Sequence, residues 1–148
     1  MSEISRRPPS LLALPSYLAG HVARIGRRGL EEELQRQGLR PPHFAVLTAL
    51  VDLGPLAQYE LADRLGFNRS HLVGYLDALE EQRLVRRERD AEDRRRHRVA
   101  LTRSGRSLQA RLYGVAEQSQ AEALGVLSAA ERRQLASLLR RVVDARDE

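Results

Sequence analysis

The sequence contains no cysteine, which excludes disulfide bonds, thiolate catalysis, cysteine-ligated zinc and thiol-based redox sensing. It also has no apolar run near the roughly 18 residues that a membrane span requires. Arg6 and Arg7 could suggest a twin-arginine export signal, but the apolar stretch that follows is short and bracketed by prolines. These absences predict a cytoplasmic protein with no membrane partner.

Lysine is absent too, so all 25 basic residues are arginine, and with 20 acidic residues they give a net charge of +5. A basic balance favours a polyanionic partner, nucleic acid before a membrane surface. Arginine suits such a partner because its planar guanidinium contacts phosphates and base edges. GC-rich coding would also replace lysine by arginine throughout, and the arginines are spread along the whole chain.

The sequence motifs of common enzyme classes are missing as well. There is no glycine-rich phosphate loop, no Gly-x-Ser-x-Gly elbow and no His-Glu-x-x-His. Glu80 and Glu81 are adjacent on an expected helix and therefore do not face each other. The histidines never stand three or four residues apart, so metal sensing is a minor alternative. The sequence predicts neither an enzyme nor a cofactor or metal site.

Proline and glycine divide the 148 residues into segments with helical periodicity. The apolar spacing predicts helices over residues 16–38, 43–51, 59–65 and 69–82. Gly66 should end the third of these and Asn68 should cap the fourth. Two helices joined by a short turn that contains glycine are typical of a helix-turn-helix.

The following segment changes character. Residues 84–89 and 97–101 have β propensity and flank a charged stretch, which predicts a β-hairpin with a long polar tip. Thr102 should cap a long helix over residues 104–124. Ser128 and Glu131 have the spacing of a capping box for a last helix that runs to about residue 145.

This order predicts a mainly α fold with a small β-hairpin wing (α+β), a single domain over residues 1–148. Residues 41–102 would form a winged helix-turn-helix. The flanking segments, 11–38 and 104–147, carry more apolar surface than that part can cover. We therefore expect them to be dimerisation helices that pack against a second copy.

Several of these motifs together resemble the MarR family of transcriptional regulators. They run from Gly54-Pro55-Leu56 through 60–66, 68–70, 76–81 and 84–87; the most specific are the wing, Asp90 to Arg96, then Leu101-Thr102 and Gly105-Arg106. The resemblance implies a symmetric dimer that binds a pseudo-palindromic operator. It also implies a small phenolic or anionic effector that weakens DNA binding.

The sequence departs from the usual family pattern at four positions. Ala57 stands where Ser or Thr commonly caps a helix, and Arg83 replaces a glycine before the first wing strand. Val73 and Gly74 stand where polar base-reading residues are common. The last two leave open which side chains contact the bases.

The expected recognition helix would place its N-terminal end in the major groove. The side chains expected on its outward face are Arg69, Ser70, His71, Gly74 and Tyr75. Ser70 and His71 offer donors and acceptors to base edges, and Gly74 would allow a close approach. The alternative is that these residues merely face solvent.

The resemblance implies further DNA contacts from the wing. Arg95 would enter the minor groove, where the negative potential is enhanced, while Asp93 orients the loop by pairing with a nearby arginine. Phosphate contacts are expected from Arg94, Arg96, Arg64 and Arg86, with Arg87 as the alternative to Arg86. A solvated charge run competes with the wing assignment, and a surface pair with Glu60 competes for Arg64.

The resemblance also suggests an effector pocket between the dimerisation helices and the winged helix. The candidate residues are Tyr17, His21, Arg24, His43, Phe44, Arg111 and Tyr113. Tyr17, His21 and Arg24 share one helical face and would suit a carboxylate or phenolate. The alternative is that Tyr17 and His21 only pack in an interface.

The sequence therefore predicts a sequence-specific DNA-binding regulator, a ligand-responsive repressor that acts as a homodimer. The rival is a winged-helix module that binds protein without specific DNA binding. A loss of DNA binding at raised salt would separate the two.

Overall fold

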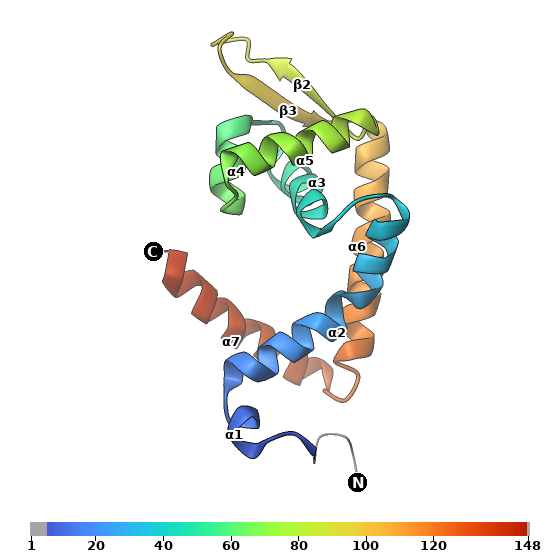
Figure 1. The fold of residues 1–148 in the computed structure, drawn as a ribbon, viewed down its shortest axis with the longest axis vertical. Helices are drawn as coiled ribbons and strands as arrows, with labels where there is room; N and C mark the ends of the chain where they lie inside the picture. The colour runs from blue at the N-terminus through green and yellow to red at the C-terminus, as the bar shows by residue number, and fades with distance from the viewer. Residues whose placement is uncertain (1–5, 148) are drawn as a thin grey trace. The chain divides into compact units, whose positions relative to one another are not determined.

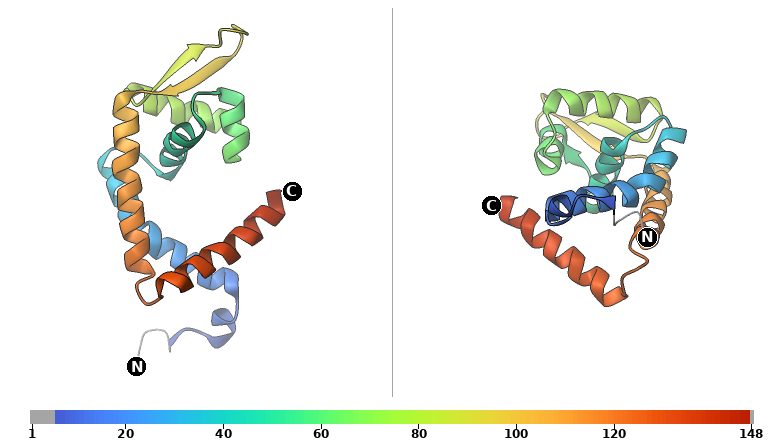
Figure 2. Two further views of the ribbon diagram at one scale, coloured as in Figure 1. Left: turned by 180° about the vertical axis from the view of Figure 1, so that it is seen from behind. Right: turned by 60° about the horizontal axis from the view of Figure 1, so that its bottom comes forward.

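A computed structural model describes residues 6–147, which form a mainly helical protein with one small sheet. The elements in chain order are α1 (Pro9–Leu12), α2 (Pro15–Arg36), α3 (Pro41–Leu53), β1 (Leu56–Ala57), α4 (Gln58–Leu65), α5 (Arg69–Glu81), β2 (Val85–Arg89), β3 (His97–Leu101), α6 (Arg103–Ala123) and α7 (Ala129–Asp147). Figures 1 and 2 trace them along the ribbon. The predicted fold class is confirmed, and helix ends differ from expectation by a few residues.

The described chain divides into two compact units. One is Gly29–Ala116 and the other joins residues 6–28 to residues 117–147. The first extends beyond the expected winged part, residues 41–102, because it includes the end of α2 and the beginning of α6. We call Gly29–Ala116 the winged unit and the other the terminal unit.

The winged unit contains the hydrophobic core. Leu72, Leu76 and Leu79 recur at helical spacing on α5, and each is 1% exposed or less. They pack with Leu47 of α3 and Leu61 of α4, which are 0% exposed. Burying one such leucine contributes about 1.5–3 kcal/mol. The periodicity that predicted the helix-turn-helix is therefore the stripe that holds it together.

The expected hairpin is part of a three-stranded antiparallel sheet in the order β1-β3-β2. Val85 of β2 pairs with Leu101 of β3, and Leu56 of β1 pairs with Val99 on the other side of β3. The sequence did not predict β1, since two residues are too few to show alternation. The β2–β3 hairpin projects past α4 and α5 as a wing (Figure 1).

Local capping follows the sequence closely. Asn68 Oδ1 accepts a hydrogen bond from the backbone N–H of Ser70 at 2.8 Å. The Ser128 hydroxyl and the Glu131 carboxylate exchange hydrogen bonds with each other's backbone N–H at 3.1 and 2.8 Å, which confirms the capping box. Ala57 precedes α4 with no side-chain cap, as its methyl group requires.

Gly105 shows why the beginning of α6 tolerates no side chain. A Cβ built there would lie 1.9 Å from the carbonyl oxygen of Leu84, which precedes β2. Thr102 Oγ1 reinforces this junction, because it accepts from Gly105 N–H at 3.0 Å and donates to Arg83 O at 2.6 Å. The Leu-Thr and Gly-Arg motifs therefore join the wing to α6.

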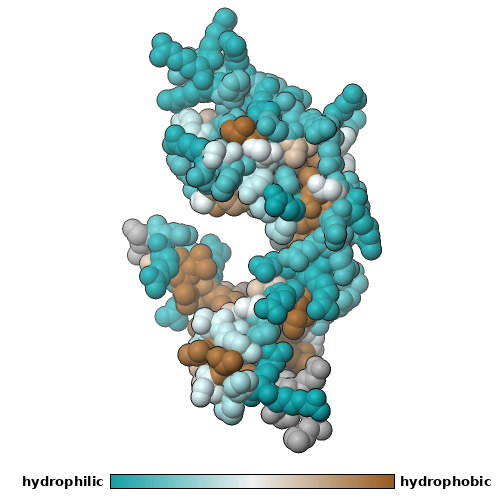
Figure 3. Space-filling model, viewed as in Figure 1, coloured by the Kyte–Doolittle hydropathy of each residue, from teal (hydrophilic) through white to brown (hydrophobic). Residues whose placement is uncertain are grey.

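The terminal unit leaves its apolar side chains exposed. Helix α7 has no buried residue, and Leu138, Leu139 and Val142 are 49%, 47% and 66% exposed. An apolar groove of about 550 Å³ runs between α2, the end of α6 and α7. Brown, hydrophobic surface is visible over α7 in Figure 3. The expectation that the outer helices carry uncovered apolar surface is confirmed.

Candidate nucleic-acid interface

The first turns of α5 present the expected polar face. Arg69, Ser70, His71 and Gly74 are all exposed. The Ser70 hydroxyl donates to Asn68 Oδ1 at 2.5 Å, which fixes its position at the N-terminal end of the helix. A Cβ at Gly74 would meet no atom within 4 Å. Packing within the chain therefore does not require glycine at this exposed helical position.

Tyr75 does not project outward as expected. It is half-buried, and its ring stacks edge-on against His43 at 5.3 Å and Phe67 at 5.6 Å between centroids. Tyr75 lies three residues after Leu72, at the margin of the buried stripe, so a large apolar ring turns inward there. Its aromatic contacts tie the recognition helix to the beginning of α3.

His43 has a structural explanation that the sequence did not reveal. Its side chain is only 6% exposed, and Nδ1 accepts a hydrogen bond from the backbone N–H of Arg40 at 2.8 Å. Burial lowers the pKa of His43 below its ordinary value. The neutral ring therefore caps α3 and supports Tyr75. Phe44, beside it, packs against the core.

The wing tip is ordered by its own acidic residues. Asp93 Oδ1 accepts from the backbone N–H of Arg95 at 3.0 Å, and Asp93 Oδ2 lies 3.5 Å from Arg96 Nε. The expected pairing of Asp93 with a nearby arginine is thus present. Within residues 6–147 no hydrogen bond or ion pair engages the side chains of Arg94 and Arg95, which are exposed. Both are available to an external partner.

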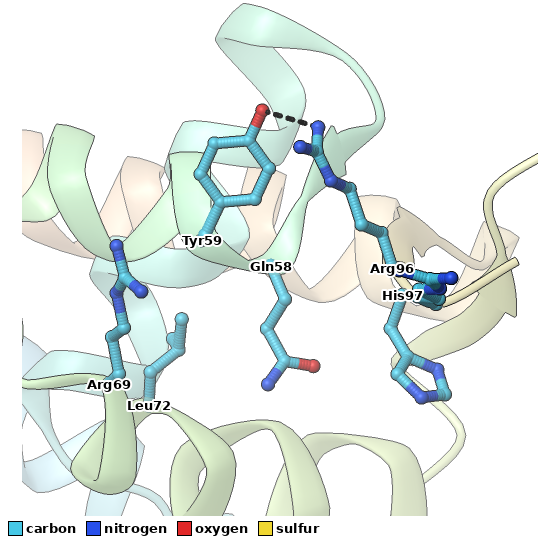
Figure 4. A pocket seen from close by; sticks show the side chains of 7 residues that line it. Gln58, Tyr59, Arg69, Leu72, Arg96 and His97 are labelled. Carbon is cyan, nitrogen blue, oxygen red and sulfur yellow. Dashed lines mark hydrogen bonds between the residues drawn. The ribbon is translucent and has the colours of Figure 1, made fainter. Parts of the chain in front are cut away.

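Arg96 is engaged differently from its two neighbours. Its Nη1 donates to the Tyr59 hydroxyl at 3.1 Å, and its guanidinium carbon lies 4.9 Å from the centre of the Tyr59 ring. We expected Arg96 to meet phosphate, but in this structure it joins the wing to the first turn of α4. Figure 4 shows the Tyr59–Arg96 hydrogen bond.

A basic pocket lies where α4, α5 and the wing meet (Figure 4). Its volume is about 250 Å³, and its lining residues are Gln58, Tyr59, Arg69, Leu72, Arg95, Arg96 and His97. No carboxylate lines it. The fold therefore brings the beginning of α5, the expected recognition helix, and the wing arginines to one electropositive hollow that fits a polyanion.

The remaining candidate arginines differ in their exposure and in the ion pairs that they make. Arg64 is exposed, and in the described part of the chain it makes no ion pair with Glu60. Arg86 pairs with Glu88 at 2.6 Å on the wing surface. Arg87 is held by two carboxylates of α5, Asp77 at 2.6 Å and Glu80 at 3.2 Å.

The two alternatives for a phosphate contact are therefore not equivalent. Hydrogen bonding to Arg87 holds the pKa of Glu80 below its ordinary value. The Arg87 side chain is only 21% exposed and joins β2 to α5. Arg86, with an exposed side chain, is the better placed of the two for an external anion.

The effector candidates of the terminal unit form a real cluster. The Tyr17 and His21 rings meet edge-on at 4.6 Å. Arg7, which the sequence analysis missed, places Nη1 2.9 Å from His21 Nε2 and 3.3 Å from the Tyr17 hydroxyl. Because a guanidinium only donates, His21 Nε2 accepts and the ring is neutral. Desolvation, then the charges of Arg7 and Arg24, lower the pKa of His21.

The other effector candidates belong to the winged unit. Arg111 Nη1 is paired with Glu33 at 3.0 Å. Tyr113, 49% exposed, lines a pocket with Thr48, Asp52 and Gln109. No periodicity links Arg7 to His21, fourteen residues apart, so only the fold could add Arg7 to the list.

Comparison with known proteins identifies the family of this chain. The MarR family model matches residues 37–96. The chain is similar to the PcaV transcriptional regulator of Streptomyces coelicolor, whose structure holds its natural ligand: identity is 30% over 91% of this chain and 95% of that one, with a TM-score of 0.75. The chain belongs to the MarR family.

Two other similar structures bear on DNA and ligands. A mutant MarR from E. coli complexed with operator DNA is 25% identical, over 86% of this chain and 91% of that one, with a TM-score of 0.74. BpsR from Bordetella bronchiseptica, whose DNA binding is regulated by 6-hydroxynicotinic acid, is 26% identical to this chain. The match covers 89% of this chain and 94% of that one, with a TM-score of 0.77.

The protein is thus a MarR-family winged-helix transcriptional regulator. MarR-family proteins are transcription regulators and not enzymes. None of the helices within residues 6–147 is long and apolar enough to cross a membrane.

Proposed function

We propose that this MarR-family regulator is a cytoplasmic, homodimeric repressor that binds a pseudo-palindromic operator and releases it when a small anionic effector binds. The observation that carries the DNA-binding part is the basic pocket, because α5 contributes Arg69 and the wing contributes Arg95 and Arg96, whereas no carboxylate lines it. The free side chains of Arg94 and Arg95 extend the same positive surface.

The recognition helix enters the major groove, with its N-terminal turns toward the base edges. Arg69, Ser70 and His71 supply the polar contacts, and Gly74 allows close approach because it carries no side chain. Tyr75 contributes to DNA binding indirectly, because its ring holds α5 against α3.

Arg95 enters the adjacent minor groove, where an arginine is favoured by the narrow groove's negative potential. Asp93 positions it through the turn. Arg94, Arg64 and Arg86 contact backbone phosphates on either side.

The exposed apolar side chains of the terminal unit support a homodimer. A second copy would cover α7 and the groove beside α2, which otherwise expose large hydrophobic residues to water. Two recognition helices related by a twofold axis would read half-sites about 34 Å apart, one turn of duplex.

Selection of bound sequences from a random duplex pool tests operator recognition and its inverted symmetry. The selected duplex is then titrated with the native protein, with Arg95→Ala and with Arg146→Ala as a control from the last turn of α7. We expect Arg95→Ala to weaken binding about tenfold or more, in line with about 1–3 kcal/mol for a specific groove contact. Equal affinities for the two variants, or binding indifferent to salt, would refute the assigned wing contact.

The cluster of Arg7, Tyr17, His21 and Arg24 supports an effector that carries a carboxylate on an aromatic ring. The guanidinium would bind the carboxylate, and the rings would form the walls. BpsR, whose DNA binding is regulated by 6-hydroxynicotinic acid, an aromatic carboxylic acid, supports an effector of this class.

Calorimetric titration with a panel of hydroxybenzoic acids tests the effector. We expect Arg7→Gln to abolish the heat of binding while Arg133→Gln, an exposed arginine of α7, retains it. Operator release should be lost in the same variant. Unchanged binding to Arg7→Gln would place the effector elsewhere.

A further inference from the structure

We propose that Tyr59 is a positioning residue for the wing: it holds Arg96 against α4, so that Arg95 is presented to DNA in a fixed orientation. This inference rests on the proposed DNA-binding function and assigns a role to a residue that contacts no base or phosphate. It divides the three consecutive arginines of the wing into one anchor and two contact residues.

The first observation is the difference among those arginines. Arg94 and Arg95 have no side-chain partner within residues 6–147, whereas Arg96 has two. Arg96 Nε faces Asp93 across 3.5 Å, and Nη1 donates to the Tyr59 hydroxyl at 3.1 Å. An arginine already satisfied on two sides gives up existing interactions if it turns toward a phosphate.

The second observation is where the two partners lie. Asp93 belongs to the turn of the wing itself, while Tyr59 is on the first turn of α4, a separate element. Tyr59 is half-buried, so its ring is a stable platform, and the Arg96 guanidinium carbon lies 4.9 Å from its centre. Arg96 is therefore a bridge from the wing turn to the helix-turn-helix.

The third observation is the coupling of Arg96 to Arg95. Asp93 uses one oxygen for Arg96 Nε and the other for the backbone N–H of Arg95. The Arg96 backbone also closes the turn, since its N–H donates to Asp93 O at 3.0 Å and its carbonyl accepts from Asp90 N–H at 2.9 Å. Fixing Arg96 on Tyr59 therefore fixes the backbone from which Arg95 projects.

The consequence is a wing whose geometry is set before DNA arrives. A free wing tip would lose conformational entropy on binding, and preorganisation lowers that cost without any added contact. Because a positioning residue neutralises no phosphate, its loss should lower affinity at every salt concentration and leave the slope of log affinity against log salt unchanged.

The experiment uses four variants of the full chain: Tyr59→Leu, Tyr59→Phe, Arg96→Ala and Arg94→Ala. Operator affinity is measured at several salt concentrations, with thermal melts to verify folding. We expect Tyr59→Leu to lose about fivefold in affinity, and Tyr59→Phe about twofold because it keeps the ring under the guanidinium. Arg94→Ala, which removes one phosphate contact from each protomer of the proposed homodimer, should lower the salt slope by about 1.8, or about 0.9 per phosphate.

Arg96→Ala decides between the two roles of this arginine. An anchor gives the same loss as Tyr59→Leu, an unchanged salt slope, and no further loss in the double variant Tyr59→Leu/Arg96→Ala. A phosphate contact, lost from both protomers, gives a slope lower by about 1.8, with Tyr59→Leu binding as tightly as the native protein. The second pattern overturns the proposal.

Amide hydrogen exchange on the free protein separates this inference from the proposed function. We expect faster exchange at Arg95 and Arg96 in Tyr59→Leu and unchanged exchange in the centre of α5. If the native protein bound no DNA, the DNA-binding proposal would fail while exchange still reported the anchor. Unchanged wing exchange in Tyr59→Leu overturns the anchor even where DNA binding is intact.

Discussion

The winged unit and the terminal unit solve the problem of stability in different ways. All the buried hydrophobic residues of the described chain lie between Leu30 and Leu112, within the winged unit. The terminal unit contributes long helices with an apolar groove and no buried residue on α7. The winged unit carries its own core, whereas the terminal unit leaves large apolar side chains exposed. The comparison teaches that a helix can be fully formed here without contributing to the core of its own chain.

The largest effect should come from the winged core. We expect Leu76→Ala to lower the free energy of unfolding by about 3 kcal/mol, because it leaves a cavity among residues that cannot fully collapse. Leu76 is 0% exposed. Leu53→Ala, on a leucine that is 46% exposed, should cost less than about 0.5 kcal/mol. Urea unfolding measures both, and similar losses would contradict a core confined to the buried stripe.

The next largest loss of stability should come from the junction between the wing and α6. In Gly105→Ala the new methyl group would collide with the Leu84 carbonyl, so we expect a loss of about 2 kcal/mol. Gly114→Ala is the matched control on the same helix, since a Cβ there meets nothing within 4 Å. That control should raise stability by about 0.5–1 kcal/mol. A neutral Gly105→Ala would show that the junction is looser than its geometry indicates.

Substitutions in the terminal unit should change the dimerisation equilibrium, which depends on protein concentration. We expect Leu139→Asp on α7 to raise the dissociation constant of the dimer about thirtyfold, because it places a charge where an apolar side chain would be buried, at about 2 kcal/mol. Sedimentation equilibrium measures the change. Asp144→Asn, on an exposed carboxylate of the same helix, is the control. A native protein that remained monomeric at all concentrations would remove the basis for covering α7 with a second copy.

Substitution of Gly74 should separate the effect of a residue on stability from its effect on DNA binding. We expect Gly74→Ala to stabilise the free protein by about 0.5–1 kcal/mol, because alanine is the better helix former and the space is open. The same substitution should weaken operator binding, since its methyl group would stand at the DNA surface. Thermal melts measure the change in stability, and operator titration measures the change in affinity. Tighter binding of Gly74→Ala would contradict close approach at this position.

The smallest effect concerns His43 and pH. Its native pKa is below the ordinary value of 6.5, so the folded state binds fewer protons than the unfolded state in that range. Its contribution to stability is complete above pH 6.5 and declines as the pH falls toward the native pKa. Urea unfolding at pH 7.5 and 5.5 should show a smaller difference for His43→Gln than for the native protein. An equal difference would assign the pH dependence to other groups, such as His21.

The positions that sequence reasoning predicted well depend on local interactions. The α5 stripe of Leu72, Leu76 and Leu79 and the cap at Asn68 involve residues within one or two helical turns of each other. So does the capping box of Ser128 and Glu131. These positions can be predicted from the sequence because an α-helix makes one turn every 3.6 residues, and its N-terminal end leaves backbone N–H groups that need a hydrogen-bond acceptor.

The positions that it missed or misplaced involve distant partners. Tyr75 was expected to face outward, but the ring of His43, on another helix, draws it inward. Arg96 was expected to contact phosphate, but Tyr59, 37 residues away, holds it. Arg7 was considered only as part of an export signal and not as an effector contact, because it precedes the periodic segment that contains His21.

The amino-acid sequence by itself determined the long helices, the caps at Asn68 and Ser128, the charged wing and the family, since all of these depend on neighbours in the chain. The tertiary structure decided which arginine of the wing is anchored, which aromatic ring is buried, where β1 joins the sheet and why Gly105 has no room for a side chain. These outcomes depend on contacts between segments whose distance in space no local pattern records, because chain packing sets it only once the elements come together.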